Sequence, residues 1–80
     1  MSVDTMTTGF GERATVRWYD GSVRVTVNNE AERVAFSLTS DTALQISETP
    51  DGRWWIVYST ADGTIVQYYS DDNARTWTQL

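Results

Sequence analysis

The segment RATVRWYDGSVRVTV, residues 13–27, decides the fold. Apolar and polar residues alternate on both sides of Asp20-Gly21, which is the period of half-buried β-strands. Asp-Gly between two such runs is the strongest short-range hairpin signal, because Gly accepts the positive φ that a type I′ turn requires. A two-residue loop then gives three apolar cross-strand pairs: Trp18–Val23, Val16–Val25 and Ala14–Val27.

The same register makes a prediction for the polar face of this hairpin. It sets Arg17 opposite Arg24, and like charges directly across a ladder are destabilising. We therefore expect an acidic side chain, from this chain or another, beside the two arginines.

The rest of the chain continues the β pattern, and no helical period of apolar residues persists. Alternating runs cover residues 34–39, 44–46, 64–69 and 76–80, and turn signals stand at residues 49–52 and 61–63. Residues 53–58 (RWWIVY) are apolar on both faces, which predicts a central strand covered on both sides. We expect an all-β antiparallel sheet, sandwich or blade-like meander of six to seven short strands, formed by residues 13–80 after a flexible arm at residues 1–12.

Composition limits the function. The chain has 80 residues, a net charge of −5, six basic residues that are all Arg, and neither His nor Cys. The acidic balance argues against nucleic acid as a partner. Without His or Cys, neither a Ser-His-Asp triad nor a thiolate mechanism can be built, nor can a disulfide support so small a core. We expect no enzyme activity and no cofactor, and we expect stabilisation by other subunits, in a homo-oligomer or a larger assembly.

The N-terminus and the hydropathy pattern bear on localisation. Residues 1–9 have no basic region followed by an apolar run, which argues against a signal peptide. No apolar stretch approaches the ~20 residues that a membrane-spanning helix needs. We expect a soluble protein outside the membrane, in a compartment that the sequence leaves open.

Residues 70–77 (SDDNARTW) carry the most specific motif in the chain. They resemble the Asp box, S-x-D-x-G-x-T-W, of the bacterial neuraminidase repeat in sialidases and other β-propellers, and the likeness extends over residues 53–80. Ser70, Asp72, Thr76 and Trp77 match, whereas Ala74 replaces the family's Gly. If that position needs φ > 0, the Cβ costs about 1 kcal/mol unless Asn73 carries the left-handed turn.

The resemblance implies a structural loop between the outer strands of a blade. In it the Asp carboxylate accepts backbone N–H groups and the Trp packs beneath the loop. In the family such boxes lie away from the catalytic centre, so the resemblance implies a folding role for these residues. Similar repeats occur in bacteriophage tail and fibre proteins, which makes a virion component one setting for the chain. Eighty residues supply at most about two blades of 40–45 residues, too few to close a ring.

Two functional hypotheses follow from the aromatic residues. Aromatic side chains fill cores, anchor subunits and stack on sugars. Residues of this kind that could serve at an interface or a ligand site are Trp54, Trp55, Tyr58, Tyr68 and Tyr69. Our principal hypothesis is a non-catalytic interaction module, and the alternative is a carbohydrate-binding module or a fragment of a glycosidase-type propeller.

Acidic residues offer weaker alternatives. A carboxylate pair could hydrolyse glycosides, and the available acids are Glu30, Glu32, Glu48 and Asp51. Each lies in a polar loop or beside a turn, where solvated acids are the rule. Asp71-Asp72-Asn73 could offer oxygen ligands to Ca²⁺, but it lacks the spaced run of acids that ends in Glu, so we predict no metal site.

Overall fold

The computed structural model describes residues 2–80 and confirms the all-β antiparallel class. Eight strands form two four-stranded sheets, each a simple meander. The first sheet contains β1 (Val3–Thr7), β2 (Arg13–Tyr19), β3 (Ser22–Val27) and β4 (Arg33–Ser37), and the second contains β5 (Leu44–Glu48), β6 (Trp54–Ser59), β7 (Ile65–Ser70) and β8 (Thr78–Gln79). Among the described residues there is no helix long and apolar enough to cross a membrane.

The β2–β3 hairpin has the predicted register. Trp18 pairs with Val23, Val16 with Val25 and Ala14 with Val27. Asp20 and Gly21 both have positive φ, 51° and 78°, as a two-residue type I′ turn requires.

The predicted acidic neighbour of this hairpin is Glu32. Arg17 does lie opposite Arg24. Glu32 accepts a 2.7 Å bond from Arg17 Nε and lies 3.8 Å from Arg24 Nη1. One carboxylate therefore offsets the repulsion between the two arginines.

The flexible arm expected over residues 1–12 is wrong for residues 3–7, which form a strand beyond the expected six to seven. Residue 1 lies outside the described residues. Residues 3–7 form β1, which pairs with β2 from Val3↔Arg17 to Thr7↔Arg13. Two contacts tie this strand to the second sheet. Asp4 Oδ2 accepts the backbone N–H of Ile46 at 2.9 Å, and Met6 packs against the core.

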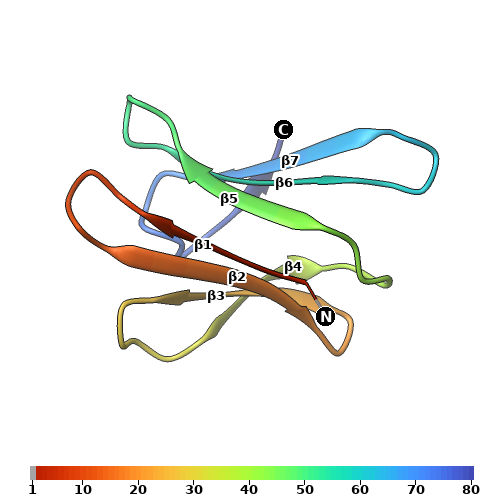
Figure 1. Ribbon diagram of the computed structural model, residues 1–80, viewed down its shortest axis with the longest axis horizontal. Coiled ribbons are helices and arrows are strands. Elements are labelled where there is room, and N and C mark those ends of the chain that lie inside the picture. The colour runs from red at the N-terminus through yellow and green to blue at the C-terminus, as the bar shows by residue number, and fades with distance from the viewer. Residues whose placement is uncertain (1) are drawn as a thin grey trace.

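The two sheets pack face to face around one core (Figure 1). Strands β1 and β5 lie side by side where the sheets come closest, and β5 also contacts β2. The core residues of the first sheet are Ala14, Val16, Val23, Val25 and Val27, and those of the second are Leu44, Ile46, Trp54, Ile56 and Tyr58. Each sheet therefore contributes one face to the core.

The first turn of each sheet has the same construction. In residues 8–12 the Thr8 N–H donates to Glu12 O and the Gly11 N–H to Thr8 O. Residues 49–53, 41 positions later in the chain, repeat both bonds, from Thr49 N–H to Arg53 O and from Gly52 N–H to Thr49 O. Gly11 and Gly52 share positive φ values of 84° and 88°. The β6–β7 turn at residues 60–64 has the same two bonds, so this turn alone does not define a repeat. The strand bounds define it, because β1 and β5 are offset by 41 positions, as are the first residues of β2 and β6.

Candidate interaction surface

The loop at residues 70–77 joins β7 to β8, the third and fourth strands of the second sheet. Asp72 Oδ1 accepts the Thr76 N–H at 2.9 Å and the Ser70 hydroxyl at 2.7 Å, and Asp72 Oδ2 accepts the Thr76 hydroxyl. Ser70 Oγ accepts the Ala74 N–H at 3.0 Å. These bonds enclose the loop around the Asp72 carboxylate.

Both residues proposed for the left-handed position adopt it. Asn73 has φ 58° and Ala74 has φ 70°. Ala74 is also buried, at 2% exposure. Its methyl group therefore contributes apolar burial that offsets part of the backbone strain.

Trp77, at the end of the loop, packs against the core. The side chain is half-buried, and its indole Nε1 is buried with no hydrogen-bond partner among residues 2–80. The ring therefore acts through its apolar contacts.

The two neighbouring acids of this loop have different partners. The hydrogen bond from the Thr76 side chain lowers the pKa of Asp72 to about 2, and burial opposes the shift. Asp71 instead faces Arg53 in a two-point ion pair, 2.8 Å to Nε and 3.0 Å to Nη2. The two carboxylates are thus engaged with different groups. No cluster of three metal-ligating side chains occurs among residues 2–80.

The five candidate aromatics divide into two groups. Trp54 and Tyr58 point into the core, at 1% and 8% exposure. Tyr68 stacks on Phe36 with ring centroids 3.6 Å apart, so it also packs between the sheets. Trp55 and Tyr69 lie on the opposite face of the second sheet, with centroids 5.7 Å apart. Interior packing accounts for the first group, and only Trp55 and Tyr69 remain available to a partner.

The prediction that β6 is covered on both faces is therefore wrong for residues 2–80. Its Trp54 side packs on the first sheet, whereas its Trp55 side faces outward. We call this outward surface the aromatic face, and its apolar residues are Trp55, Val57, Ile65 and Tyr69, with Gln45 and Gln67 on either side of Val57. Ile65 is 58% exposed and the other three apolar residues are half-buried. The β6 strand is apolar on both sides, and its Trp55 side is not covered by the first sheet.

The guanidinium group of Arg53 already binds this surface within the chain. The Arg53 Cζ lies 4.1 Å from the centroid of the Tyr69 ring and 5.8 Å from that of Trp55. Such cation–π contacts draw the cation to the negative face of the ring. The aromatic face is therefore suited to arginine.

The outward surface of the first sheet has a different chemistry, which sequence reasoning did not identify as a site. We call the central part of this surface, on β2 and β3, the arginine face, and it consists of Arg13, Thr15, Arg17, Arg24 and Thr26. Tyr19 adjoins it, with the Arg24 Cζ 5.5 Å from the centroid of the Tyr19 ring. Glu32 is the acid that pairs with this face. Arg24 Nε is buried without a hydrogen-bond partner among residues 2–80. The sequence signal for this face was the arginines and threonines that alternate with the core residues along β2 and β3.

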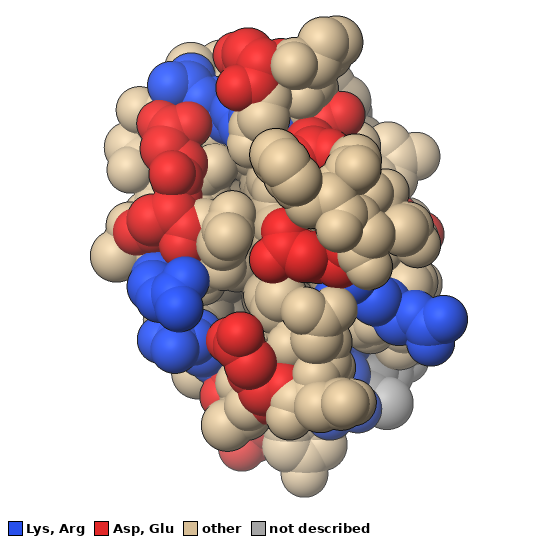
Figure 2. All heavy atoms as spheres, turned by 90° about the vertical axis from the view of Figure 1, so that its left-hand side faces the viewer, with Lys and Arg blue, Asp and Glu red and all other residues tan. Residues whose placement is uncertain are grey.

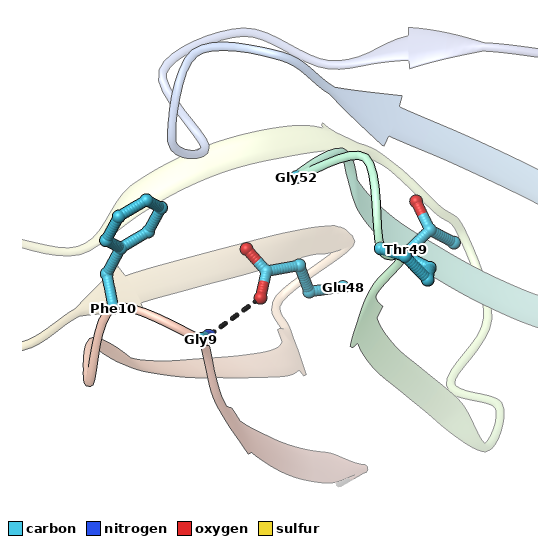
Figure 3. Close-up of a pocket in the computed structure, with 6 residues that line it drawn as sticks. Gly9, Phe10, Glu48, Thr49 and Gly52 are labelled. Carbon is cyan, nitrogen blue, oxygen red and sulfur yellow. Dashed lines mark hydrogen bonds between the residues drawn. The ribbon is translucent and has the colours of Figure 1, made fainter.

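A depression of about 390 Å³ lies between the turns at residues 8–12 and 49–53 (Figure 3). Glu48 Oε1 accepts the Gly9 N–H at 2.8 Å across it. Phe10, at 91% exposure, stands at its rim. Of its lining residues, Gly9, Phe10, Glu48, Thr49, Pro50 and Gly52, Glu48 alone has a carboxylate, whereas glycoside hydrolysis uses a pair.

The charge on this end of the molecule is mixed. Figure 2 shows acidic and basic side chains interspersed over the end that carries these turns. Comparison with protein-family models, curated proteins and solved structures finds no match to this chain.

Proposed function

We propose that this chain is a non-catalytic interaction module that works within an oligomer or a larger assembly. The observation that carries the proposal is the aromatic face, which lies on the side of the second sheet that faces away from the first sheet. Its apolar residues are Trp55, Val57, Ile65 and Tyr69. Contiguous apolar surface on a small domain is typical of an interaction site. The lack of His and Cys supports a role other than catalysis. The Asp-box resemblance supports a virion as one setting.

Sedimentation velocity over a wide range of protein concentration tests this proposal. We expect species heavier than the 9.1 kDa chain, in proportions that change with concentration. A well-folded monomer at every concentration, which also contacts no other chain in its native particle, would contradict it.

A second candidate, carbohydrate binding, is favoured by the geometry of two rings. Trp55 and Tyr69 lie half-exposed with an interplanar angle of 53°, and aromatic rings of this kind stack on sugars. Titration with a panel of glycans tests it, with Trp55→Ala as the variant that should lose any signal. A signal that survives in Trp55→Ala, or no binding across the panel, would count against this candidate.

A further inference from the structure

We propose that the aromatic face of one copy of this chain packs against the arginine face of a second copy, head to tail. This inference rests on the proposed interaction module and identifies its partner as the chain itself. Four observations carry it: the repeat of 41 residues, the orientation of the two sheets, the chemistry of the two open faces and the polar groups at their edge.

The repeat sets a residue-by-residue correspondence between the sheets. The matching turns align Thr8 with Thr49 and Gly11 with Gly52. In this alignment Ala14 and Val16, which face the second sheet, correspond to Trp55 and Val57, which face away from the first. The core-facing side of the first sheet is therefore equivalent to the outward side of the second sheet, so the two sheets stack head to tail.

The contact between the sheets is consequently heterologous, because it joins one side of the first sheet to the opposite side of the second. A heterologous contact leaves one unused copy of each surface, and it forms a ring when its rotation closes. Here the unused surfaces are the aromatic face and the arginine face. A second copy of the chain carries the surface that each of them lacks.

The chemistry of the two faces is complementary. The arginine face has three guanidinium groups against the one carboxylate of Glu32. The aromatic face already holds Arg53 over the Tyr69 ring within the chain. Arg13, Arg17 and Arg24 of a second copy would meet rings and apolar surface suited to stacked guanidinium groups. Apposition of two arginine faces would instead bring like charges together.

The edge strands predict a specific hydrogen bond across the same contact. Within the chain, the Asp4 side chain accepts the backbone N–H of Ile46. The repeat aligns Asp4 with Gln45, which is exposed, and Ile46 with Thr5. In the β1–β2 ladder, the Thr8 N–H donates to Glu12 O and the Trp18 N–H donates to Ser2 O. Hydrogen-bonded and non-hydrogen-bonded pairs alternate along an antiparallel ladder, so the Thr5 N–H points away from β2. Gln45 of one copy should therefore accept the Thr5 N–H of the next.

One contact of the internal interface has no counterpart in this arrangement. Glu48 accepts the Gly9 N–H, but the aligned positions hold Thr7 and Pro50, and Pro has no N–H. The contact between copies is thus weaker at this end. Its formation should depend on protein concentration.

A mixing experiment tests the head-to-tail contact. Trp55→Glu disrupts only the aromatic face and Thr15→Glu only the arginine face, while Ala61→Glu adds the same charge at an exposed turn residue that belongs to neither face. We expect each face variant alone to sediment as a monomer and Ala61→Glu to associate like the wild type. An equimolar mixture of the two face variants retains one intact pair of faces, so it should form a heterodimer of twice the chain mass and nothing larger.

Other outcomes of the mixing experiment separate this inference from the proposed function. If one face variant still self-associates, or the mixture forms no heterodimer, the chain associates by another geometry and the head-to-tail contact is wrong while the proposed function stands. If the wild type is a monomer throughout, the contact is wrong and the self-association test of the proposed function also fails. Circular dichroism of each variant verifies folding.

Engineered cysteines in the edge strands β1 and β5 test the register. The chain has no native Cys, so Gln45→Cys and Thr5→Cys each introduce a unique thiol. Under mild oxidation of a mixture, we expect the Gln45→Cys/Thr5→Cys heterodisulfide to exceed its statistical share. A statistical distribution, or an excess of either homodisulfide, would overturn the proposed register.

Discussion

The Asp4 carboxylate accepts the backbone N–H of Ile46 at 2.9 Å and thereby joins the edge strands of the two sheets. Each of these strands presents unpaired backbone groups along its open side, and a carboxylate satisfies one of them. The bond also fixes β1 against β5. A residue in the first few positions of the chain therefore determines how the layers meet.

Replacement of Asp4 should measurably weaken the fold. We expect Asp4→Ala to lower the free energy of unfolding by about 1.5–3 kcal/mol, because a charge-assisted bond is lost and the Ile46 N–H is left without its acceptor. Asp4→Asn keeps an acceptor and should cost less. Urea denaturation of the three proteins gives the comparison, and equal losses for Ala and Asn would show that the hydrogen bond is not the cause.

The two adjacent acids of the 70–77 loop should differ sharply. Asp72→Ala removes the acceptor for the Thr76 N–H and two hydroxyls and should cost about 1.5–3 kcal/mol. Asp71→Ala removes an exposed ion pair with Arg53 and should cost much less. Thermal denaturation tests this, and similar losses for the two variants would contradict a structural role specific to Asp72.

Stability should fall in acid because of Asp72. Its pKa is lowered from 3.8 to about 2 in the folded state, so the folded protein holds the charged form more tightly than the unfolded chain does. This contribution is fully present above about pH 4 and is lost as the pH falls toward 2. Unfolding free energies at pH 6, 4 and 2.5 should show a loss that is smaller in Asp72→Asn, because the lowered pKa values of Asp41, Asp51 and Asp62 remain in that variant. Parallel curves for the two proteins would exclude Asp72 as a source.

Glu32 should stabilise the β2–β3 hairpin by screening Arg17 from Arg24. We expect Glu32→Gln to cost about 0.5–1 kcal/mol at low ionic strength, since both arginines are partly exposed. The difference should shrink in 0.5 M salt, where charges are screened over a few ångströms. A cost that persists unchanged in salt would point to a role other than charge.

Trp77 should stabilise the fold through its ring and not through its N–H. Trp77→Ala should cost about 3 kcal/mol, as a large-to-small change against the core. Trp77→Phe should cost much less, because the ring is kept and a buried donor without a partner is removed. Chemical denaturation measures both, and equal costs would mean that the indole N–H has a partner in solution.

The sequence was informative where one face of a strand is buried and the other is solvated. The β2–β3 hairpin followed from the period of its valines and from Asp20-Gly21, and the need for Glu32 followed from the register. The β1 strand escaped detection because threonines occupy most of its outward positions, so no apolar stripe marks it. Its strand character comes from tertiary contacts of Asp4 and Met6.

The candidate surface was only partly predictable. The apolar pattern on both sides of β6 is the same whether the second side is covered by this chain or by another chain. The sequence therefore could not show which of Trp54 and Trp55 faces the core. The repeat is also hidden, because the aligned positions hold opposite chemistry: Arg17 corresponds to Tyr58 and Ala14 to Trp55. Few residues recur, chiefly Thr8 as Thr49 and Gly11 as Gly52, where the turn geometry requires them.

The meander order of the strands has a consequence for how the chain folds. Every strand pairs only with its neighbours in the sequence, so each hairpin closes a short loop at low entropic cost. The contacts between β1 and β5 span about half the chain and can form only after both meanders exist. Folding should therefore begin with hairpins on a microsecond timescale, and the slower docking of the two layers should limit the rate.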